Sequence, residues 1–139
     1  MKNSTFPYAQ VRFADIQLLR YRVPAFQDLS LGQKQYVYHL AEAALCGRDI
    51  LWDQNCRHNL AIRRLLEDIL QNSAIVHEGK DWEAFLTYLR QVWFANGIHH
   101  HYSTDKFQPA FSAEWLGQAY RAIPSPVIGP EEFERLAAV

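Results

Sequence analysis

Cysteine is scarce in this chain of 139 residues, which has only Cys46 and Cys56 and no CxxC pair. Two cysteines are too few for a disulfide scaffold. The missing CxxC pair excludes the paired-thiolate motifs used in zinc and redox sites. We therefore expect two free thiols, and we expect Cys46 to be buried.

An excess of charge of either sign is also missing. The 14 lysines and arginines balance 15 aspartates and glutamates, which leaves a net charge of -1. Basic surfaces attract nucleic acids and anionic membranes, so we expect neither as a partner.

No apolar run approaches the roughly 20 residues that cross a bilayer, and MKNSTFPYAQVRF lacks the apolar stretch of a secretory leader. The sequence predicts a cytoplasmic protein. If a leader has been removed from the parent chain, a periplasmic or exported location is the alternative.

The motifs of the common hydrolases and nucleotide-binding proteins are absent from the sequence. It contains no GxSxG elbow and no glycine-rich phosphate loop, and HEGKD at 77–81 lacks the second histidine of HExxH. We assign no catalytic residue. The acidic residues are expected to be solvated surface groups: Glu42, Asp49, Asp53, Glu67 and Asp68.

Apolar residues make up 49% of the chain and aromatic residues 14%, and most of them recur at helical spacing. This predicts a mainly α protein, a bundle of four to five helices with an extended N-terminal lead-in. We divide the chain into the lead-in at 1–28, a helical core at 29–121, and a turn-rich segment with a short terminal helix at 122–139.

The first helix is expected to begin after Ser30, which forms a capping box with Gln33, and to run through LGQKQYVYHLAEAALCGRDILWDQN. We expect His39 to be a core histidine with its hydrogen bonds satisfied. The inward face is expected to hold Tyr36, Val37, Leu40, Ala44 and Leu45.

Two further helices are expected at 57–71 and from about Lys80 to the Asn96-Gly97 pair, which is typical of a left-handed C-terminal cap. Ser112 is the expected N-cap of AEWLGQAYRAI. Pro130 is expected to start a last short helix, which has no C-terminal cap, and we expect the parent chain to have been cut there.

Three consecutive histidines follow the Asn96-Gly97 pair. In an extended segment only His99 and His101 share a face, and two histidines do not complete a zinc site. The His77-Glu78 pair and Asp105 are candidate completions, so metal binding through His99 and His101 stays as an alternative. We expect instead a solvated or substrate-facing loop.

Three stretches together resemble the bacterial branch of the dipeptidyl peptidase III family of two-lobed zinc exopeptidases. They are FADIQLLRYRVPAFQDL, QYVYHLAEAALCGRDILWDQN and YLRQVWFANGIHHHYSTDKF, in the order in which the family has them. The resemblance covers residues 13–121. It implies an N-terminal part of the lower lobe of a larger α+β enzyme, because family members are several times longer.

The resemblance implies an enzyme that removes dipeptides from peptide N-termini, with zinc held by an HExxGH motif that this chain lacks. The resemblance therefore implies that this chain holds no cofactor itself and that zinc belongs to the full-length enzyme. The implied partners are a peptide substrate and the missing zinc-bearing lobe. The aromatic at the interlobe cleft falls at Tyr102. The other implied members of the substrate-binding loop are Asn96, Gly97, Asp105, Lys106 and Phe107.

A second interpretation stays open. The many aromatic residues are also compatible with a free-standing helical protein-interaction module that has no enzymatic activity.

Overall fold

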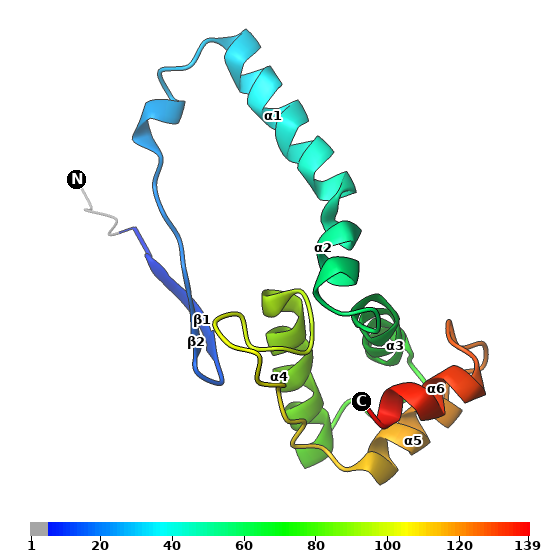
Figure 1. Ribbon diagram of the computed structural model, residues 1–139. Helices are drawn as coiled ribbons and strands as arrows, with labels where there is room; N and C mark the ends of the chain where they lie inside the picture. Colours follow the sequence, from blue (N-terminus) through cyan, green and yellow to red (C-terminus); the bar gives the residue numbers. More distant parts are fainter. Residues whose placement is uncertain (1–5) are drawn as a thin grey trace. The chain divides into compact units, whose positions relative to one another are not determined.

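The computed structural model describes residues 6–139, which divide between Arg48 and Asp49 into two compact units. We call them the N-terminal unit (6–48) and the C-terminal unit (49–139). The described chain is mainly helical with a small two-stranded sheet, which confirms the predicted fold class of a helical bundle with an extended lead-in (Figure 1).

The N-terminal unit begins with an antiparallel pair of strands, β1 (Ala9–Phe13) and β2 (Ile16–Leu19). Phe13 pairs with Ile16 across a tight turn, and a bulge interrupts the register between Ala9 and Arg12. A short 3-10 helix, η1 (Pro24–Phe26), follows. In this unit only one described apolar side chain, that of Ile16, is buried.

Helix α1 (Leu31–Cys46) starts with the predicted capping box. The Ser30 N–H donates to Gln33 Oε1 at 2.9 Å, and the Gln33 N–H donates to Ser30 Oγ at 3.3 Å. The prediction of an inward face on this helix is wrong, because α1 has no buried residue. Cys46, which was expected to be buried, is exposed, and so is His39.

The long helix predicted up to residue 55 is interrupted at Gly47, after which α2 (Arg48–Asn55) begins. The Gly47 N–H donates to the carbonyl of Ala44, three residues back, at 3.2 Å. Such a bond tightens the last turn of a helix and ends the regular ladder. Trp52 is the buried residue of α2.

The C-terminal unit contains the remaining helices, α3 (Asn59–Gln71), α4 (Lys80–Ala95), α5 (Ala113–Arg121) and α6 (Pro130–Ala137). The predicted starts of α4 and α6 and the Ser112 N-cap are confirmed, since Ser112 Oγ accepts from the Trp115 N–H at 3.1 Å. One continuous hydrophobic core joins these helices. Its most buried side chains are Trp52, Ile69, Phe85, Leu89 and Val92.

Three contacts show how the ends of this bundle are joined. The rings of Tyr120 on α5 and Phe133 on α6 stack with centroids 4.0 Å apart, and the Tyr120 hydroxyl donates to the carbonyl of Ile128 at 3.0 Å. Asp81 at the start of α4 accepts from the Ser112 N–H at 2.8 Å. No described helix is both long enough and apolar enough to cross a membrane.

Candidate functional site

The histidine loop, residues 96–107, follows directly from the end of α4 (Figure 1). Asn96 adopts the left-handed conformation at φ 53° and ψ 39°, and the Gly97 N–H donates to the carbonyl of Val92 at 3.0 Å. The predicted left-handed cap is therefore confirmed. It directs the chain away from the helix axis and into the loop.

The base of the loop is held by Asn59, a fully buried side chain on α3. Asn59 Oδ1 accepts from the Ile98 N–H at 3.2 Å, and Asn59 Nδ2 lies 3.5 Å from the Asn96 carbonyl. Gly97 lies between these two contacts. A Cβ atom at Gly97 would meet the Asn59 amide, with Cγ only 2.7 Å away, so only glycine fits here.

The two arms of the loop are joined by backbone hydrogen bonds. The His100 N–H donates to the Asp105 carbonyl at 2.8 Å, and the Phe107 N–H donates to the Ile98 carbonyl at 2.8 Å. At the tip, Ser103 Oγ donates to Asp105 Oδ2 at 3.0 Å and accepts from the Asp105 N–H at 3.2 Å. Asp105 thus shapes the turn.

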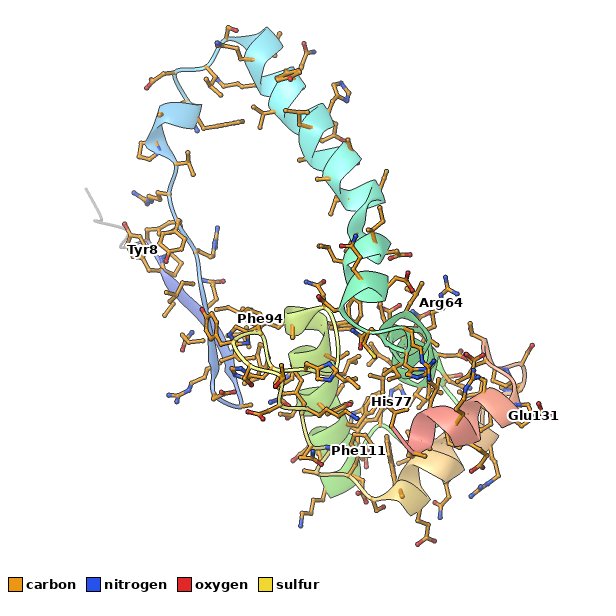
Figure 2. All side chains as sticks on the ribbon, in the orientation of Figure 1. Tyr8, Arg64, His77, Phe94, Phe111 and Glu131 are labelled. Atoms are coloured by element: carbon orange, nitrogen blue, oxygen red, sulfur yellow. The ribbon has the colours of Figure 1, made fainter. Side chains whose placement is uncertain are left out.

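Aromatic rings gather on the loop in what we call the ring cluster, made of Phe94, His100, His101, Tyr102 and Phe107. His101 lies between the Phe94 ring at 4.9 Å and the Tyr102 ring at 4.1 Å (Phe94 is labelled in Figure 2). Phe107 is buried in the core, whereas Tyr102 is 88% exposed. The cluster therefore links the core to an exposed aromatic side chain.

A cavity of about 420 Å³, which we call the histidine cavity, lies beside this cluster. All three histidines of the triplet line it, together with Asn55, Asn59, Ser103 and Thr104. Imidazole, amide and hydroxyl groups donate and accept hydrogen bonds, so this lining suits a polar ligand such as a peptide backbone.

The predicted loop residues thus have different surroundings. Asn96, Gly97 and Asp105 set the backbone of the loop, Phe107 packs into the core, and Tyr102 projects into solvent. Lys106 is exposed and donates through Nζ to the main-chain oxygen of Val139 at 2.7 Å. Tyr102 and the histidines are the groups in position to contact a ligand.

His77, the proposed completion of a metal site, stacks on Trp82 at 4.1 Å, on the N-terminal turn of α4. Among residues 6–139, no group of three or more histidine, cysteine or acidic side chains is arranged to hold a metal ion.

The role of Arg63 on α3 was not predicted from the sequence, in which its partner Glu67 was expected to be a solvated surface group. Its side chain is only 15% exposed, and its guanidinium donates to Glu67 at 2.8 Å and to Asp49 at 2.7 Å. Glu67 also accepts from Trp93 Nε1 at 3.0 Å. The hydrogen bond to Glu67 raises the pKa of Arg63, against the opposite effect of partial burial.

Asn59 was missed as well. The only signal in the sequence is a polar residue at the start of a helix, which is the usual place for a solvated cap. Its partners, Asn96 and Ile98, lie 37 and 39 residues further along the chain, so the local sequence pattern could not reveal them.

Comparison with models of known protein families gave no match, and comparison with curated proteins gave none either.

Proposed function

We propose that this chain is the N-terminal, peptide-binding portion of a zinc-dependent dipeptidyl peptidase resembling dipeptidyl peptidase III. The three quoted stretches support the proposal, and the single structural observation that carries it is the exposed Tyr102 on a braced loop beside the histidine cavity. An exposed aromatic on a fixed loop offers a peptide broad contact at a low entropic cost.

In this proposal the chain supplies scaffold and binding surface, and a second lobe supplies zinc and the base. The Tyr102 ring lies 4.1 Å from the His101 ring on one side, and the rest of it is open to a ligand. The polar histidine cavity accepts backbone groups of the bound peptide.

Hydrolysis of a dipeptidyl arylamide tests the proposal. The chain alone is expected to cleave no reporter and to retain no zinc after dialysis, whereas the chain joined to the downstream part of its parent gene cleaves it. Robust cleavage by residues 1–139 alone refutes the proposal.

Tyr102 allows a sharper measurement in the joined enzyme. We expect Tyr102→Ala to lower kcat/KM by about tenfold, because a buried aromatic contact with ligand contributes on the order of 1 kcal/mol or more. Tyr102→Phe keeps the ring and is expected to retain most of the activity. Gln108→Ala, an exposed position just after the loop that does not line the histidine cavity, controls for general effects on the loop.

A second function is favoured by one observation, that α1 has no buried residue. A helical interaction module would use these apolar side chains to bind another protein. A stop codon directly after Val139 in the parent gene, with no HExxGH sequence downstream, would favour this function over the first.

A further inference from the structure

One face of helix α1 (Figure 1) carries a row of exposed apolar side chains, which we call the α1 stripe: Leu31, Tyr38 and Leu45. They are spaced seven residues apart, which is two helical turns, so they lie on the same face. Each of the three side chains is more than half exposed. Large apolar side chains that gather on an exposed face favour contact with another protein surface.

Two charged residues flank the α1 stripe. Lys34 and Glu42 lie four residues before and four residues after Tyr38, so both share its face of the helix. No acidic residue lies within one turn of Lys34, and no lysine or arginine lies within one turn of Glu42. Lys34 Nζ donates to the Gln27 carbonyl at 3.0 Å, which uses one of its three donors, and Glu42 is exposed. Neither charge is therefore neutralised along α1 itself.

The arrangement is symmetric about Tyr38. Leu31 and Leu45 lie seven residues to either side of it, and Lys34 and Glu42 lie four residues to either side. If two such helices pack antiparallel with their Tyr38 residues at the centre, each Leu31 meets a Leu45 and each Lys34 meets a Glu42. A parallel pair would place Lys34 against Lys34 and Glu42 against Glu42, and these like charges repel each other.

We propose that the α1 stripe binds a second copy of this chain in a symmetric antiparallel dimer centred on Tyr38. The apolar side chains of the stripe supply the association, and the two lysine–glutamate pairs fix its direction and register. The opposite face of α1, with the exposed Tyr36 and Leu40, takes no part in this contact and remains available to the rest of a larger protein.

Sedimentation equilibrium of the 139-residue chain at about 100 µM tests this, since such a concentration populates even a weak dimer. We expect the unaltered chain to dimerise. Lys34→Glu and Glu42→Lys are each expected to weaken the dimer about tenfold, because either change alone puts like charges at both pairs. The chain that carries both changes keeps the net charge of -1 and is expected to recover the affinity, because every pair is again opposite in charge.

Glu134→Lys is the matched control, since Glu134 is an exposed acid on α6 and the charge changes by the same amount as in Glu42→Lys. An unaltered chain that stays monomeric overturns the proposal and would mean that a different protein surface covers the stripe. A dimer that the single changes do not weaken, or that the double change does not restore, overturns it as well. None of these residues lines the histidine cavity, so failure here leaves the proposed peptide binding unchanged.

Discussion

At the scale of single residues, Asn59 shows how one buried amide can position a functional loop. Its carboxamide contacts backbone groups on both sides of Gly97, so the helix end and the first arm of the loop are fixed together. A buried amide without partners would be costly, which is why its two contacts must form when the loop folds.

We expect Asn59→Ala to lower the free energy of unfolding by roughly 1 to 3 kcal/mol, because the Ile98 N–H loses its partner in a buried place. Urea denaturation measures the loss, and hydrogen exchange at Ile98 reports the loosened loop. Asn55→Ala is the control, since Asn55 lines the same cavity but is exposed. Equal effects of the two variants would contradict this role for Asn59.

Tyr88 gives a prediction for alkaline pH. Burial raises the pKa of Tyr88 to about 12, above the ordinary value of 10.0. Below pH 10 the phenol is protonated in both the folded and the unfolded chain and the stability is unaffected. Above pH 10 the unfolded chain releases this proton first, so the folded state loses stability as the pH rises toward 12.

The size of this loss is roughly 2 to 3 kcal/mol by pH 12. Other tyrosines and lysines titrate in the same range, so the measured quantity is the difference between the unaltered chain and Tyr88→Phe in urea denaturation between pH 8 and 11. The two chains are expected to differ in slope, with Tyr88→Phe losing less stability. Parallel curves would mean that Tyr88 ionises normally.

At the scale of helices, Arg63 connects three elements. Its guanidinium joins α2 through Asp49 and α3 through Glu67, and Glu67 continues the network to Trp93 on α4. The same guanidinium lies over the Trp52 ring, with its central carbon 5.3 Å from the centroid. The planar guanidinium of arginine is better suited to such combined contacts than the ammonium group of lysine.

We expect Arg63→Ala to destabilise the C-terminal unit by roughly 1 to 2 kcal/mol, since the change removes two ion pairs and uncovers Trp52. Thermal denaturation followed by Trp fluorescence detects it. Arg64→Ala is the matched control, because Arg64 is the exposed neighbour on the same helix. A similar loss in both variants would mean that helix propensity rather than the network is responsible.

Helix ends were predictable from sequence because their signals are local. The Ser30–Gln33 box, the Asn96-Gly97 cap and Pro130 each act within one turn, and each is found where it was expected. The exposure of the apolar side chains of α1 was not predictable. The spacing of apolar residues indicates which side chains share a face of the helix, but it does not indicate whether another element covers that face. The Asn59 contacts and the Arg63 network depend on tertiary packing.

The candidate site was predictable in part. The sequence places the histidine triplet and Tyr102 after a capped helix, and the structure has them on one braced loop. Which loop residue points outward could not be predicted, since Tyr102 and Phe107 are both aromatic residues of the same loop. Their exposures differ, 88% against 9%, because Phe107 pairs with Ile98 at the base whereas Tyr102 lies at the tip.

At the scale of the whole molecule, the two units differ in how they bury apolar surface. Helix α1 has apolar side chains on opposite sides, with Leu31, Tyr38 and Leu45 spaced seven residues apart and Tyr36 and Leu40 on another face. All five are exposed. A helix that is apolar all round is usually a buried helix, which supports the proposal that this chain works as part of a larger protein.

The continuous hydrophobic core, in contrast, lies entirely within residues 49–139. We therefore expect a fragment of residues 47–139, which retains all of α2, to unfold cooperatively in urea with a free energy within about 1 kcal/mol of that of the full chain. The reason is that removal of the N-terminal residues takes away little buried apolar surface.

A fragment of residues 1–48 is expected to give no cooperative transition, because Ile16 is its one buried apolar side chain among the described residues. Circular dichroism of both fragments and of the full chain measures this. If 47–139 loses its transition, or if 1–48 shows one of its own, α1 and the strands contribute to the stability of the core, and the division of the chain into one stable and one dependent unit is wrong.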